Sequence, residues 1–158
     1  MNGIQYMLRE LHLGEKVIAT DLLQLAERHV AEHEVHHVAK DLARWSQQHV
    51  RLLADHAPHF ELHLDYEGGQ VANAPRHAVS AAEAAGAAGL LLLEELRHVY
   101  LRASENSVDW EMLAQVAQAK KVAELVELSQ RCHPQTLRQI RWANTMIKTL
   151  SPQILSSL

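Results

Sequence analysis

The chain is poor in the residues that interrupt helices, with 6 glycines and 4 prolines among 158 residues. Both residues disfavour helix interiors, so their scarcity favours long helices. Aromatic residues make up only 4% of the chain against 47% hydrophobic residues in all, which indicates an aliphatic core. The single cysteine, Cys132, excludes a disulfide within the chain and favours a reducing compartment.

Charge and hydropathy exclude further classes of protein. The formal net charge of -4 disfavours a nucleic-acid partner, which needs a basic face. The first residues lack a basic region followed by an apolar run, so we expect no secretory signal. The most apolar segment, Ala84 to Leu93, is too short to span a bilayer. We therefore expect a soluble cytoplasmic protein without membrane contact, folded as a single domain over residues 1–158.

Hydrophobic periodicity predicts an all-α fold with five helices, at about residues 4–31, 36–57, 80–103, 108–131 and 134–150. The apolar stripes before and after residue 31 are out of phase, which predicts two antiparallel helices joined by a turn between about Ala31 and His37. Pro58 ends the second helix, and a long crossover follows it.

Local signals set the remaining boundaries. Ser80 and Glu83 form a predicted capping box at the start of the third helix. A turn is predicted from Ser104 to Ser107. Pro134 stands at the predicted first position of an additional C-terminal helix, beyond the four that a bundle requires.

One short stretch contains four histidines and matches H-E-x-x-H at His33, Glu34 and His37. On a continuous helix this pattern is typical of a zinc protease. The phase shift places it across the predicted turn, which favours solvated histidines. An alternative is surface binding of nickel, zinc or copper by histidines four residues apart, such as His29 with His33.

Polar residues on the inward stripes are the stronger candidates for a site. Glu15 lies between Leu11 and Ile18, and His49 lies between Trp45 and Leu52. Buried carboxylates and imidazoles are costly unless they are paired or bind a metal. Inward acids and histidines on four helices are typical of a carboxylate-bridged di-metal site. The third helix offers Glu94 and His98, and the fourth helix offers Glu124 and Glu127.

Two motifs resemble those of the ferritin-like superfamily, and more narrowly of the YciE-like ferritin-like proteins. They are Gly14-Glu15-Lys16 in the first helix and Gln48-His49-Val50-Arg51-Leu52 in the second. The resemblance implies an antiparallel four-helix bundle with a long crossover between the second and third helices, and Glu15, His49 and Glu94 as ligands. The chain departs from the family pattern at Ser46, where a glutamate is expected, and at Gln130, where a histidine is expected.

The sequence thus predicts a protein that binds iron or manganese in the bundle core, with oxidase or metal-handling activity. The predicted metal ligands are Glu15, His49, Glu94, His98 and Glu127. The alternative is a non-catalytic stress or interaction protein with a degenerate, metal-free site, in which His49 is hydrogen-bonded to Glu15 or Glu94. Haem ligation by His49 or His98 and a homodimer contact through the fifth helix also stay open.

Overall fold

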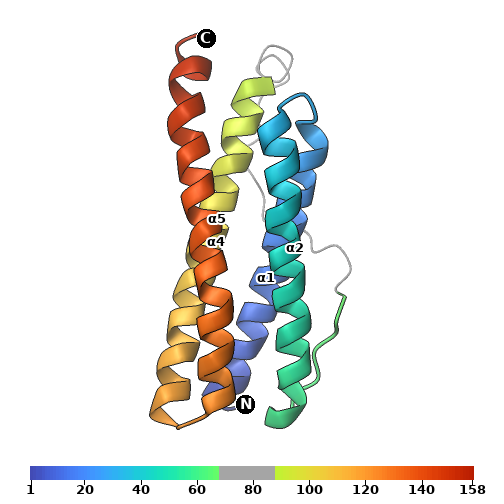
Figure 1. Ribbon diagram of the computed structural model, residues 1–158, viewed down its shortest axis with the longest axis vertical. Coiled ribbons are helices and arrows are strands. Elements are labelled where there is room, and N and C mark those ends of the chain that lie inside the picture. Colours follow the sequence, from blue (N-terminus) through green and yellow to red (C-terminus); the bar gives the residue numbers. More distant parts are fainter. Residues whose placement is uncertain (68–87) are drawn as a thin grey trace.

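The computed structural model describes residues 1–67 and 88–158, and over these ranges the protein is all-helical (Figure 1). The elements are α1 (Gly3–Arg28), α2 (His33–His56), the short 3-10 helix η1 (Ala57–Phe60), α4 (Ala88–Ala119) and α5 (Ala123–Leu155). No strand occurs within the described residues. The predicted all-α class is confirmed. None of the helices in these ranges has the length and apolarity that a membrane span requires.

The four long helices lie side by side as a bundle (Figure 1). α1 starts at the lower end of the view and α2 returns there, whereas α4 starts at the upper end and α5 returns to it. α1 packs against both α2 and α4, and α4 packs along α5. The predicted cap at Ser80 and most of the predicted crossover fall on residues 68–87, which lie outside the described residues.

The first turn of the bundle lies earlier than the sequence predicts. α1 ends at Arg28, and α2 begins at His33, where the Glu32 carbonyl accepts the first helical hydrogen bond from the His36 amide at 2.9 Å. No glycine marks this turn, so the phase shift alone could not locate it. The placement between Ala31 and His37 is wrong, and the pattern from His33 to His37 lies within a continuous helix.

The predicted turn from Ser104 to Ser107 is also wrong, because α4 continues through it to Ala119. Its polar side chains have partners in the helical state. The Ser104 hydroxyl donates to the Tyr100 carbonyl at 2.7 Å, and the Asn106 amide donates to the Gly14 carbonyl at 3.1 Å. Residues that favour turns in isolation are therefore accommodated by the helix and by its packing on α1.

The additional C-terminal helix does not exist as a separate element. The predicted break at Pro134 is wrong, since α5 passes through it from Ala123 to Leu155. Proline removes the hydrogen bond to the carbonyl four residues earlier, that of Gln130. Both Pro134 and Gln130 are on the exposed side of α5, whereas the neighbouring Cys132 and Thr136 are fully buried. Packing on both sides of the proline keeps the helix continuous.

The break that does occur lies between α4 and α5, within the predicted 108–131 helix. Lys121 has a φ of 57°, and the Val122 amide donates back to the Ala117 carbonyl at 2.8 Å. This arrangement is a Schellman-type helix end, in which glycine is the usual residue at the left-handed position. With lysine there instead, the sequence carried no signal for the turn.

The core consists of two apolar clusters separated by polar residues. The lower cluster includes Leu11, Leu53, Trp110 and Cys132, and the upper cluster includes Ile18, Leu42, Ala103 and Ala143. Between them lies a set that we call the polar layer, in which every side chain except Gln135 is buried. Its members are Glu15 on α1, Ser46 and His49 on α2, Asn106 on α4, and Gln135, Thr136 and Gln139 on α5.

Candidate metal centre

The predicted ligands Glu15 and His49 meet in the polar layer. His49 Nδ1 lies 3.0 Å from Glu15 Oε2, and both side chains are fully buried. On the other side of the ring, His49 Nε2 lies 2.7 Å from Gln135 Oε1. Trp110 Nε1 donates to Glu15 Oε1 at 3.2 Å. The four side chains therefore join all four helices through one hydrogen-bonded network.

The charge of this network follows from its partners. The two nitrogens of His49 lie next to Glu15 Oε2 and Gln135 Oε1, an arrangement that favours a protonated ring which donates to both oxygens. Burial acts to lower the pKa of His49, but the charge of the Glu15 carboxylate and its hydrogen bond to the ring raise the pKa to about 11. The pair is a buried salt bridge whose hydrogen-bonding groups are already occupied.

A di-metal centre does not fit these residues. Such centres in helix bundles use a glutamate from each of two helices and a Glu-x-x-His pair from each of the other two. At the level of Glu15, α2 has Ser46-x-x-His49, which lacks the glutamate of such a pair. At the same spacing α5 has Cys132-x-x-Gln135, which lacks both the glutamate and the histidine. Trp110 on α4 directs an N–H group at Glu15, where a metal would have to lie. The interior therefore suits a metal-free ion pair.

The other three predicted ligands are elsewhere. Glu94 and His98 are half-buried on the upper part of α4, and Glu127 is exposed near the start of α5. Within residues 1–67 and 88–158, none of the five predicted ligands belongs to a group of three possible ligand residues whose ligand atoms lie close together. Metal ligation by Glu94, His98 or Glu127 stays a prediction. The acid that is buried on α4 is Glu95, whose Oε1 lies 3.2 Å from Arg28 Nη1.

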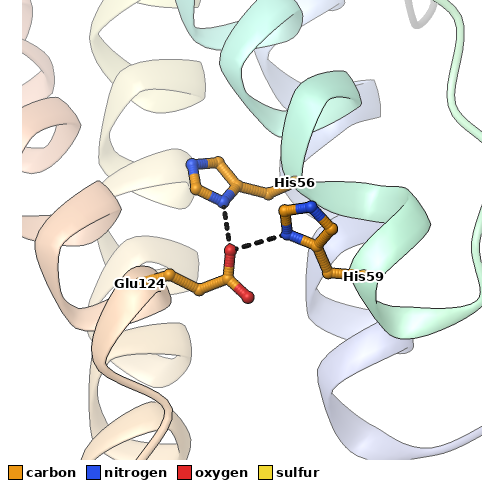
Figure 2. Close-up of side chains that lie close together, drawn as sticks. All are labelled: His56, His59 and Glu124. Atoms are coloured by element: carbon orange, nitrogen blue, oxygen red, sulfur yellow. Dashed lines mark hydrogen bonds and ion pairs between the residues drawn. The ribbon is translucent and has the colours of Figure 1, made fainter.

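The group of potential ligands that does come together lies at the lower end of the bundle and consists of His56, His59 and Glu124 (Figure 2). One ligand atom from each residue lies within 4.8 Å of the other two. His56 Nδ1 and His59 Nδ1 both point at the same oxygen, Glu124 Oε2, and each lies 2.8 Å from it. We call this group the His56–His59–Glu124 site.

Local structure explains how two histidines three residues apart face one carboxylate. α2 ends at His56, and Pro58 lies in the tight 3-10 turn of η1, which brings His59 round beside His56 with the ring centroids 6.1 Å apart. Glu124 lies in the first turn of α5, directly after the turn at Lys121. The carboxylate thus extends from the start of one helix to the end of another.

The site is partly open to water. The side chains of His56, Glu124 and His59 are 25%, 36% and 60% exposed. Burial acts to raise the pKa of Glu124, but the hydrogen bonds from His59 and His56 hold it below its ordinary value, so the carboxylate is ionised at neutral pH. An anionic oxygen and two imidazole nitrogens that meet at one accessible point form a ligand set for a divalent transition metal.

Sequence reasoning singled out Glu124 as a carboxylate of the fourth helix but did not connect it with His56 and His59. The signal that could have found the site is the proline-bounded pair His56-x-x-His59 at a helix end. The third ligand could not be found, because the helix that carries it was predicted to start at residue 108 rather than at Ala123.

The histidines of the α1–α2 turn form no comparable group. His33 and His37 stack with ring centroids 6.2 Å apart, and His36 Nδ1 lies 2.7 Å from the Ala26 carbonyl oxygen. His29 is buried against Glu95, with 3.6 Å between His29 Nε2 and Glu95 Oε1. Across the described part of the chain, the pattern H-E-x-x-H has no third ligand beside it of the kind that a zinc protease requires.

No protein-family model matches this chain, and no curated protein or solved structure is significantly similar to it.

Proposed function

We propose that this protein binds a divalent transition metal ion, zinc in the first instance, at the His56–His59–Glu124 site. The observation that carries the proposal is the convergence of two imidazole nitrogens and one ionised carboxylate oxygen within 4.8 Å. His56 and His59 belong to α2 and η1, which adjoin in the sequence, whereas Glu124 belongs to the distant α5, so the fold brings the carboxylate to the two histidines.

The donor types select the class of metal. Imidazole and carboxylate ligands suit zinc and its neighbours among the transition metals, whereas magnesium and calcium prefer oxygen ligands alone. Three protein ligands leave a fourth tetrahedral position for water or for a group from another molecule. With zinc–ligand bonds of about 2.0–2.1 Å, tetrahedral ligands lie about 3.3 Å apart. The present nitrogen–oxygen distances of 2.8 Å need only a small expansion.

The wider proposal concerns the bundle itself. The order of the helix ends supports a ferritin-like chain path, since α2 ends at one end of the bundle and α4 begins at the other. We assign no iron or manganese to its centre, because Trp110, His49 and Gln135 already occupy the groups around Glu15. In this proposal the interior of the bundle has no catalytic role, and the protein binds metal at one end of the bundle.

Zinc titration of protein purified without an affinity tag tests the proposal. Isothermal titration calorimetry should give one zinc per chain, and His56→Ala, His59→Ala and Glu124→Gln should each weaken binding by at least about tenfold. His37→Ala removes an exposed histidine at the other end of α2 and serves as the matched control. The proposal fails if His37→Ala weakens zinc binding as much as His56→Ala does, or if the unsubstituted protein binds no zinc.

A further inference from the structure

The contact between α2 and α5, which we call the α2–α5 seam, differs from the other helix contacts of the bundle. The two helices approach each other closely at only a few positions, whereas each packs far more extensively on its hairpin partner. Three polar connections join them. Gln139 Nε2 donates to the Leu42 carbonyl at 3.0 Å and to Ser46 Oγ at 2.8 Å. His49 contacts Gln135, and His56 contacts Glu124.

These connections follow one another along the antiparallel helices, with the His56–His59–Glu124 site as the last of them. Residues of α2 and α5 also share both apolar clusters, but the two helix backbones approach each other closely at few positions. The direct links between them are hydrogen bonds, which contribute little net stability where water can replace the protein partner. The seam is therefore the contact of the bundle that separates at the smallest cost. Local openings of this kind are drawn from the least stable contacts of a native protein.

Two buried groups of the polar layer lower the cost of opening further. Gln139 Oε1 and Thr136 Oγ1, both on α5, have no hydrogen-bond partner among residues 1–67 and 88–158 in the closed state. Water admitted by an opening would satisfy both atoms. The closed seam therefore keeps polar atoms unsatisfied that the open seam would hydrate.

We propose that the α2–α5 seam opens locally in the native protein and that a metal ion at the His56–His59–Glu124 site holds it closed. This inference rests on the proposed function for its metal-dependent part. His56 and His59 belong to the α2 side of the seam and Glu124 to the α5 side, so one ion bonded to all three bridges it. Metal occupancy then controls access to the polar layer.

The chain carries a reporter for such an opening. Cys132, its single cysteine, is fully buried on α5, one helical turn before Gln135 of the seam. Its reaction with N-ethylmaleimide, followed by the intact mass of the native protein, measures how often the seam opens. The matched control is Cys132→Ala/Ala103→Cys, whose thiol replaces a fully buried methyl group on α4, a helix that is not part of the seam.

Without metal, Cys132 should react at least about tenfold faster than the control thiol after correction for the measured unfolding free energy of each variant. Zinc at a hundred times its dissociation constant should slow Cys132 by about 100-fold. The His56→Ala/His59→Ala variant should lose this zinc effect. Equal rates for the two thiols in metal-free protein would overturn the local opening.

The two proposals fail in different ways. If calorimetry shows zinc bound at the site but the labelling rate of Cys132 does not change, the metal does not hold the seam and this inference is wrong. If calorimetry shows no zinc binding, the proposed function is wrong and the metal-dependent part of this inference falls with it. The comparison of the two thiols in metal-free protein still decides whether the seam opens.

Discussion

Replacement of Glu15 by glutamine should reverse the pH dependence that His49 gives to folding. The pKa of His49 is raised to about 11 in the native protein and is about 6.5 in the unfolded chain. Between these values the folded state binds one more proton than the unfolded state. The stability from the pair is complete below pH 6.5 and decreases as the pH rises toward 11, by up to about 1.4 kcal/mol per pH unit.

In the Glu15→Gln variant the charge that raises the pKa of His49 is gone, while the burial that lowers it remains. The folded state then favours the neutral ring, so the stability of the variant should increase with pH up to about 6.5 and stay level above it. Breaking a fully buried pair costs about 3–5 kcal/mol. From pH 7 to pH 9 the difference between the two proteins should shrink by about 2.7 kcal/mol, because only the unsubstituted protein loses stability there.

Urea unfolding followed by circular dichroism at half-unit steps from pH 5 to pH 9 measures both profiles. Glu27→Gln, which changes an exposed acid on the same helix, controls for the loss of one negative charge. Parallel profiles for the unsubstituted protein and Glu15→Gln between pH 7 and pH 9 would show that His49 is neutral in the native state, and the ion pair would have to be abandoned.

Three further predictions concern the interior. Gly14→Ala should cost roughly 1–3 kcal/mol in urea unfolding, because a Cβ at Gly14 would overlap Asn106 Oδ1. In an Asn106→Ala background the same change should stabilise by up to about 1 kcal/mol, since alanine is the better helix former. Trp110→Phe should cost about 1.5–3 kcal/mol by leaving Glu15 Oε1 without its donor, and zinc binding should be unaffected in calorimetry. The His56→Ala/His59→Ala variant should retain less than about a tenth of an equivalent of iron after loading, as measured by mass spectrometry. One full equivalent would show that the interior of the bundle binds the metal.

Much of the fold could be predicted because the relevant signals are local. Helical periodicity and the scarcity of glycine and proline indicate an all-α protein. The periodicity also places Leu11, Glu15 and Ile18 on the inward side of α1, and all three are fully buried. The helix boundaries failed where tertiary contacts override local preference. Pro134 is tolerated on an exposed side of α5, and Lys121 adopts a conformation that usually needs glycine.

The two candidate sites also differ in how far the sequence could predict them. The Glu15–His49 pair could be predicted from the sequence, because each residue interrupts an apolar stripe and is therefore expected to be buried. A buried carboxylate or imidazole without a partner is costly in free energy, so the two are expected to pair. The stripes do not predict the neighbours Trp110 and Gln135, which occupy the hydrogen-bonding groups of Glu15 and His49. The His56–His59–Glu124 site depends on where α5 begins, and that was set by a turn without a sequence signal.

Anomalous diffraction at the zinc edge, from a crystal of the zinc-loaded protein, would show where the ion lies. We expect one strong peak at the lower end of the bundle, about 2.0–2.1 Å from Nδ1 of both His56 and His59 and within bonding distance of a Glu124 oxygen. A peak beside Glu15 in the polar layer, or one between His33 and His37 with none at the predicted position, would contradict this expectation.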